Sequence, residues 1–386
     1  MPSLSTHRLA AQAGFATQGG VFISLTTRLP HLRDHWGLSD LSLSGLLLMM
    51  VLLAGVGSVT AEALAKRHDS ATLLRAGLVV IAVGVPVLTT APALPVMILG
   101  MALYGVGLGV VDACTNMQAV ALEHAYARPI LPSFYGAWTL GGVLGAALGL
   151  ALGDAPLWAG AFVAIVPLVV AATPLLPRAE VPATDTTGVP WRPIMLVGLG
   201  MVLFYMVDTA AQTWGPTYLD DTFSAPSHLV ALATFPYLVA SLLTRFAGDG
   251  LVRRYGVTPV LRTGAVVGAL ALAVVVFAPS WPVAVVGFTV LGAGVAVIAP
   301  LSFSAAARIA GGDQTRIDAV IARFNQFNYA GALLGSVLTG VVGSGSLRFG
   351  FAVPMVLILG MLPLARAFAA GHDVAANPVA APSSTP

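Results

Sequence analysis

Residues 248–256 read GDGLVRRYG, and residues 61–69 read AEALAKRHD. When the two segments are aligned, both have an acidic residue at the same position and a pair of adjacent basic residues at the same later positions. These are Glu62, Lys66 and Arg67 in the first copy and Asp249, Arg253 and Arg254 in the second. The match continues at the same spacing into Leu-Arg-x-Gly segments at 74–77 and 261–264. A loop of the first half thus recurs in the second half, as in membrane transporters built from two parallel repeats. A chance similarity of two basic loops is the alternative, because topology alone enriches such residues.

The composition predicts an all-α integral membrane protein. Hydrophobic residues make up 57% of the 386 residues and charged residues 9%, a balance that cannot cover a soluble domain with a solvated surface. A membrane-spanning helix needs about 20 mostly apolar residues, and such stretches recur along the chain. We expect twelve, at residues 10–30, 42–62, 73–90, 95–120, 130–152, 157–177, 194–217, 228–248, 258–278, 282–306, 319–343 and 350–369.

The twelve spans divide six plus six. Residues 178–193 contain three prolines and several small polar residues, the composition of a flexible linker. We therefore expect an N-terminal six-helix bundle at 1–177, a cytoplasmic linker at 178–193 and a C-terminal six-helix bundle at 194–370. Residues 371–386 are rich in Ala, Pro and Ser, which predicts a disordered cytoplasmic tail.

The basic residues predict the orientation. Short cytoplasmic loops retain Lys and Arg, and with both termini in the cytoplasm only Arg28, Arg33 and Arg348 fall on the outer side. An even number of spans satisfies this pattern. We expect a multi-pass protein of the plasma or inner membrane.

Several function classes find no support in the residues. The formal net charge of +2 is too small and too scattered for a nucleic-acid surface. His31 and His35 approach metal-ligand spacing, but they follow Pro30 in what we interpret as an exposed loop, so no metal site is expected. The sole lysine, Lys66, lies in no phosphate-binding loop. We find no nucleophile, base and oxyanion arrangement, and we expect neither an enzyme nor a cofactor.

The segment at 248–256 resembles the signature of the major facilitator superfamily. Within that superfamily, residues 107–116 (GLGVVDACTN) and 133–138 (SFYGAW) are similar to segments of the fucose permease-like proton symporters. The resemblance implies two pseudo-symmetric six-helix bundles, with the first, fourth, seventh and tenth helices lining a cavity and transport by alternating access. It also implies a gate made by the charged residues of the two repeated loops. The alternative is that these charges only set the topology.

Two carboxylates are the candidates for proton coupling. Asp112 and Asn116 share one face of their helix, and Asp208 shares a face with Tyr205 and Gln212. An ionisable side chain costs about 2.5–3.5 kcal/mol at the centre of a membrane helix, so it usually serves a substrate or an ion. A structural acid that bonds a neighbouring helix is the alternative for Asp112.

Further polar and aromatic residues are candidates for binding the solute. They are Asn116, Tyr135, Trp138, Tyr205, Gln212, Trp214, Arg323, Gln326 and Asn328. Aromatic side chains in spans are also common as interface anchors, and Arg323 lies near enough to a span end to extend toward the membrane surface instead.

The function expected from these residues is secondary active transport. A small polar, sugar-like solute would move by proton symport, through a monomer whose partners are the solute, protons and the lipid bilayer. Proton-driven efflux of a drug or metabolite is the alternative, and the residues do not exclude a receptor that binds without transport.

Overall fold

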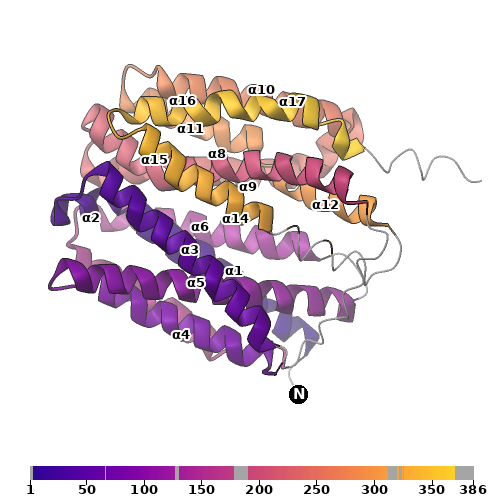
Figure 1. The fold of residues 1–386 in the computed structure, drawn as a ribbon, viewed down its shortest axis with the longest axis horizontal. Coiled ribbons are helices and arrows are strands. Elements are labelled where there is room, and N and C mark those ends of the chain that lie inside the picture. The colour runs from indigo at the N-terminus through magenta and orange to yellow at the C-terminus, as the bar shows by residue number, and fades with distance from the viewer. Residues whose placement is uncertain are drawn as a thin grey trace, which may run out of the picture.

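The computed structural model describes residues 3–65, 67–126, 130–177, 190–311, 320, 324 and 326–369. Within these residues all regular elements are helices. Figure 1 shows the helices of the first half in the lower part of the view and those of the second half in the upper part. Helix α2 lies at one end of the bundle and the N-terminus near the other. We call them the α2 end and the N-terminal end.

The first half contains seven α-helices and one 3-10 helix. They are α1 (Leu4–Thr26), α2 (Leu29–Trp36), α3 (Asp40–Ala65), α4 (Ser70–Thr89), α5 (Leu94–Tyr126), α6 (Leu131–Leu152), the 3-10 helix η1 (Leu157–Ala164) and α7 (Ile165–Ala171).

The second half is similarly helical. Its elements are α8 (Trp191–Phe223), η2 (Ser227–Ala233), α9 (Phe235–Tyr255), α10 (Val257–Val276), α11 (Trp281–Val295), α12 (Ile298–Ala310), α14 (Gln326–Leu333), the π-helix η3 (Leu334–Leu338), α15 (Thr339–Val342) and α16 (Leu347–Leu357). Short helices η4 (Ile358–Gly360), α17 (Met361–Leu364) and η5 (Ala367–Ala369) complete the described part.

Each of the twelve expected spans overlaps described helix. Nine described helical segments are long and apolar enough to cross a membrane. Helix α1 is not among them although it has 23 residues, because it carries polar side chains such as Gln18 that are buried within the protein. On α3 the exposed side is apolar, with Leu52, Val56 and Val59. This is the surface expected of a helix that contacts lipid.

The expected spans at 10–30 and 282–306 are each interrupted near a proline. The span at 10–30 ends as α1 at Thr26, and α2 begins at Leu29 with a proline in its first turn, a position that proline favours. His31 and His35 therefore lie on a helix and not, as we expected, in a loop. The span at 282–306 breaks between α11 and α12. Pro300 lacks the N–H that would otherwise bond Ala296, four residues earlier.

Close helix contacts hold each half together. In the first half α5 packs on α3 and α4, and in the second α11 packs on α9 and α10. At Gly109 a Cβ atom would overlap the carbonyl oxygen of Ala54, so the approach of α5 to α3 requires glycine there. The halves meet where α3 contacts α14, η3 and α15 and where α6 contacts α9. The cavity described next lies along these contacts.

Candidate functional site

A cavity of about 150 Å³ lies between the two halves. Its polar lining residues in the first half are Gln18, Asp112, Tyr135 and Trp138. Those in the second half are Tyr205, Asp208, Thr209, Gln212, Thr213, Arg245, Asn328, Tyr329 and Ser336. The rest of the first-half wall is mostly apolar, with residues such as Phe15, Phe22 and Met50. The polar side of the cavity thus belongs mainly to the second half.

Asp112 connects the two halves. One of its carboxylate oxygens accepts a hydrogen bond from Gln18 on α1, at 3.0 Å, and the other accepts one from the hydroxyl of Tyr329 on α14. One turn further along α5, the side chain of Asn116 donates to the backbone oxygen of Asp112 and accepts from the Tyr135 hydroxyl at 3.1 Å. The carboxylate therefore accepts donors from both halves and faces the cavity.

Asp208 sits entirely within the second half. Its side chain is buried, and the hydroxyl of Tyr237 on α9 donates to it. Gln212 lies one turn further along α8, close enough to influence this carboxylate, but its amide nitrogen is buried without a hydrogen-bond partner. Because a buried carboxylate needs donors to offset lost hydration, the bond from Tyr237 helps to accommodate Asp208 at the cavity wall.

Arg245 brings a positive charge to the same cavity. Its Nη1 donates to the hydroxyl of Thr139 on α6, at 2.6 Å, and its Nε is buried without a hydrogen-bond partner. Among the described residues no carboxylate forms an ion pair with it, although Asp208 lies close enough to be influenced by its charge. The contact with Thr139 is the second polar contact between the halves along this wall.

Aromatic rings bound the cavity on the side of α6. The ring of Tyr135 stacks on Phe303 of α12, with centroids 5.3 Å apart and an interplanar angle of 24°. Phe303 in turn meets Phe324 edge to face. Although α12 thus contacts the site, neither α11 nor α12 supplies a lining residue in the described part of the chain. The tenth span, unlike the first, fourth and seventh, therefore does not line this cavity directly.

The structure brings many of the expected site residues together. Both proton-coupling candidates line the cavity, as do Tyr135, Trp138, Tyr205, Gln212 and Asn328. Asn116 lies behind Asp112 and touches the cavity only through its partners. Trp214 is fully buried instead, and its indole nitrogen donates to the Ser336 oxygen at 2.7 Å. Gln326 is exposed, and Arg323 lies outside the described residues.

None of the expected gating residues whose side chains the structure describes lines the cavity, although Glu62 lies close enough to Asp112 to be influenced by its charge. Glu62, Arg67, Arg253 and Arg254 are exposed. Lys66 and the side chain of Asp249 lie outside the described part of the chain. A gating role for these charges stays a prediction.

The halves are also joined at the α2 end. Arg33 of α2 forms ion pairs with Asp220, at 3.6 Å, and Asp221, both in the last turn of α8. Nearby, a Cβ atom on Gly340 would overlap the Ser44 hydroxyl, which shows how closely α15 approaches α3. Arg33 thus ties the first half to the second at this end.

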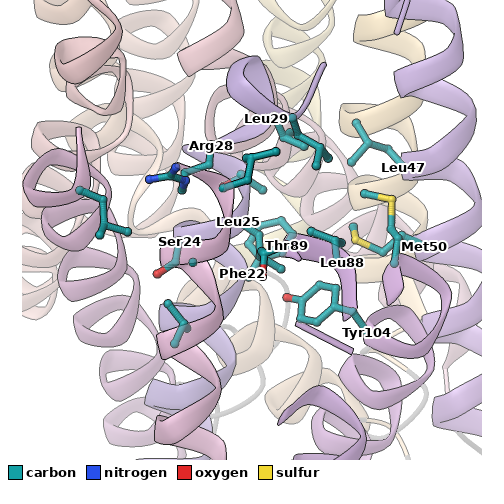
Figure 2. Close-up of a pocket in the computed structure, with 17 residues that line it drawn as sticks. Phe22, Ser24, Leu25, Arg28, Leu29, Leu47, Met50, Leu88, Thr89 and Tyr104 are labelled. Atoms are coloured by element: carbon teal, nitrogen blue, oxygen red, sulfur yellow. The ribbon is translucent and has the colours of Figure 1, made fainter. Parts of the chain in front are cut away.

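A second, smaller cavity lies within the first half. Arg28, Thr89 and Tyr104 are among its lining residues (Figure 2). Its volume is about 30 Å³, which suits at most a water molecule or two. Arg28 is held there by a bond to the Ala155 oxygen. This cavity is too small for a solute, and the interface cavity is therefore the better candidate site of the two.

Sequence reasoning missed several residues of the site, among them Arg245, Tyr237 and Tyr329. Arg245 was assigned to the basic residues that set topology, and Tyr237 and Tyr329 were not selected. The sequence marks Arg245 as a candidate, because it lies within an apolar segment, Ser227–Gly248, that is long enough to cross the membrane. It does not mark the two tyrosines, because tyrosine is common in spans at the membrane interface.

Comparisons with known proteins agree with this architecture. A family model described as Major Facilitator Superfamily matches residues 197–383. An uncharacterized MFS-type transporter of Yersinia pestis is 27% identical over 95% of this chain and 99% of its own length. A crystal structure of the nucleoside transporter NupG superposes with a TM-score of 0.69 at 16% identity, covering 94% of this chain and 98% of NupG. The E. coli fucose:proton symporter FucP superposes with a TM-score of 0.62 at 14% identity, covering 93% and 98%.

The family model matches the second half, and the superposed transporters cover nearly the whole chain with the same arrangement of helices. The apolar helices and the cavity between the halves fit a carrier that moves small-molecule solutes across a membrane. The chain therefore has the fold of major facilitator superfamily transporters, and its second half matches the family model itself.

Proposed function

We propose that this chain moves a small polar, sugar-like solute across the cell membrane by proton-coupled symport. The observation that carries the proposal is the position of Asp112. It lines the cavity and accepts a hydrogen bond from Tyr329 of the opposite half. A proton arriving at this carboxylate weakens a charge-assisted contact between the halves, so proton binding and the relative movement of the halves are coupled through one group.

The lining supports a polar cargo. Carboxylate, amide, hydroxyl and indole groups converge on the cavity, and these groups hydrogen-bond the hydroxyls of a sugar. The volume of about 150 Å³ is well below the roughly 300 Å³ or more that drug-sized ligands occupy. Both features favour a small polar solute over a bulky drug. FucP, a fucose:proton symporter by its title, provides an analogy of fold only.

The closed α2 end supports alternating access. If both termini are cytoplasmic, as the basic residues favour, the α2 end faces outward and Arg33 holds it shut in this conformation. We further propose that residues 1–177 and 194–370 are the two moving bundles. Residues 178–193 would link them. The chain works as a monomer in this proposal.

Proton flux into proteoliposomes tests the proposal. A panel of sugars, sugar acids and cationic drugs is added while the internal pH is followed. We expect a solute-dependent acidification that Asp112→Asn abolishes while the protein still inserts. Asp69→Asn, which changes an exposed acid at the start of α4, is the matched control and retains the flux. Undiminished flux in Asp112→Asn contradicts the assigned role of this carboxylate.

Efflux of a drug or metabolite is the competing function. The apolar first-half wall, with Phe15, Phe22 and Met50, is the feature that favours it, because apolar surface binds amphipathic compounds. Cells that express the protein would accumulate the solute under our proposal and lose it under efflux. The direction of movement in cells therefore separates the two.

A further inference from the structure

Arg245 places a positive charge at the cavity wall, and no carboxylate in the described part of the chain forms an ion pair with it. It lies on α9, three residues before the end of the apolar segment Ser227–Gly248, which is long enough to cross the membrane. A charged side chain within such a segment costs free energy unless it is paired, faces a polar cavity or reaches the membrane surface. Arg245 lines the cavity, so its charge is available to whatever enters there.

Within the described residues, the contacts of Arg245 leave much of its hydrogen-bonding capacity unused. A guanidinium has five N–H donors. One of these nitrogens bonds the neutral hydroxyl of Thr139, and Nε is buried with no partner. The nearby acid of the same half, Asp208, already accepts a hydrogen bond from Tyr237. No described carboxylate forms an ion pair with Arg245.

A planar guanidinium with free donors is suited to a carboxylate, which it binds through two parallel N–H···O bonds. Hydroxyl and amide groups of Tyr205, Gln212 and Asn328 line the same cavity and are suited to the hydroxyl groups of a polyol. We propose that Arg245 binds a carboxylate of the solute, so that the cargo is a small polyhydroxy acid such as a sugar acid. This inference rests on the proposed function for the sugar-like part of the solute.

The charges around the cavity favour a single negative charge on that solute. Asp112 and Asp208, when ionised, place two negative charges beside the one positive charge of Arg245. A dianionic phosphate would meet these carboxylates at close range, where like charges repel. A monoanion that enters with one proton adds no net charge to the cavity. The empty and loaded carriers then have the same total charge in a region of low dielectric constant, where net charge is costly.

Ligand binding to the purified full-length protein tests the inference independently of transport. The probes are pairs with related carbon skeletons, gluconate with sorbitol and glucuronate with glucose, together with glucose 6-phosphate. Dissociation constants are measured from the thermal stabilisation that each probe produces. We expect each acid to bind about 10- to 100-fold more tightly than its neutral counterpart, the range for hydrogen bonds to a charged group.

Four variants separate anion binding from other roles of the residue. Arg245→Gln removes the charge and is expected to abolish the preference for the acid. Arg245→Lys keeps the charge without the planar fork and is expected to retain part of it. Thr139→Val removes the Arg245–Thr139 contact while leaving the guanidinium in place, so the preference for the acid should persist. Arg192→Gln removes an exposed arginine at the start of α8 and serves as the control for surface charge.

The inference is overturned if neutral probes bind as tightly as the acids, if no acid binds, or if glucose 6-phosphate binds best. It is equally overturned if Thr139→Val and Arg245→Gln have the same effect, because Arg245 then acts only by joining the halves. Proton flux in proteoliposomes distinguishes the two proposals. Arg245-dependent binding of acids without proton flux supports this inference and contradicts proton coupling, whereas flux driven only by neutral sugars does the reverse.

Discussion

Replacing Arg33 by glutamine should open the α2 end. Arg33 bonds four carboxylates, two in its own half and two in the other. The distances are 3.1 Å to Asp34, 3.4 Å to Asp40 and 3.6 Å to Asp220, and Asp221 is also in direct contact. Removing the arginine deletes both ion pairs that cross between the halves and leaves four like charges facing one another.

The size of the effect follows from these contacts. Partly exposed ion pairs contribute roughly 0.2–1 kcal/mol each. The arginine side chain here is only 14% exposed. The two ion pairs that join the halves should therefore lie at the upper end of this range and contribute about 2 kcal/mol together. Repulsion among the remaining carboxylates adds up to about 1 kcal/mol. A change of about 2–3 kcal/mol shifts the equilibrium toward the open α2 end by about 30- to 150-fold.

Spin-label distances measure this shift. Cys114 is the single cysteine, so labels can be placed in a Cys114→Ser background at Leu41→Cys on α3 and Phe277→Cys after α10, two exposed positions. In Arg33→Gln we expect a longer distance to become the major population. Arg33→Lys preserves the charge and should retain most of the closed population, and added salt should weaken closure in the wild type. An unchanged distance distribution in Arg33→Gln would refute the assignment of this cluster as a latch.

Two further predictions concern stability. Gly109→Ala places a Cβ atom against the Ala54 oxygen and should lower the free energy of unfolding by about 1–3 kcal/mol. Gly55→Ala is the control, because its added Cβ meets no atom within 4 Å, and it should be neutral or slightly stabilising. Thermal unfolding in detergent compares the two variants, and equal melting temperatures would contradict the close approach of α5 to α3. Burial, reinforced by the positive charge of Arg28, lowers the pKa of His31 below 6.5, so the folded state binds fewer protons than the unfolded state and stability falls as pH drops from 6.5 through the lowered pKa. His31→Gln should flatten this part of the profile, and a profile identical to that of the wild type would show that His31 does not cause it.

The helical spans were predictable from the sequence because lipid imposes one uniform requirement. Every backbone polar group in the hydrocarbon must be bonded within its own helix, so each span appears as a long apolar run whatever it packs against. The interruptions after Thr26 and at Ala296 were harder to locate. Each interruption lies near a proline, which removes a single backbone hydrogen bond. The apolar composition continues across the break, so the composition does not reveal it.

Part of the site was also predictable, for a different reason. Asp112 and Asp208 are rare acids in long apolar runs, and in the structure both face the cavity. Arg245 escaped notice because a basic residue within a few turns of a span end is normally explained by topology. Whether such a residue faces lipid, water or the cavity depends on the rotation of α9 against α6. That rotation is set by contacts between distant segments, such as the bond from Arg245 to Thr139.

The polar contacts across the cavity connect solute binding to movement. Tyr329 bonds Asp112 and Arg245 bonds Thr139, and each contact joins one half to the other. A proton on Asp112 weakens the bond from Tyr329, and a solute carboxylate on the free donors of Arg245 places a second ligand on the other side chain that joins the halves. Since a ligand shifts a conformational equilibrium only by its differential affinity for the two states, proton and solute move the halves to the extent that each binds more tightly when these contacts are open than when they are closed.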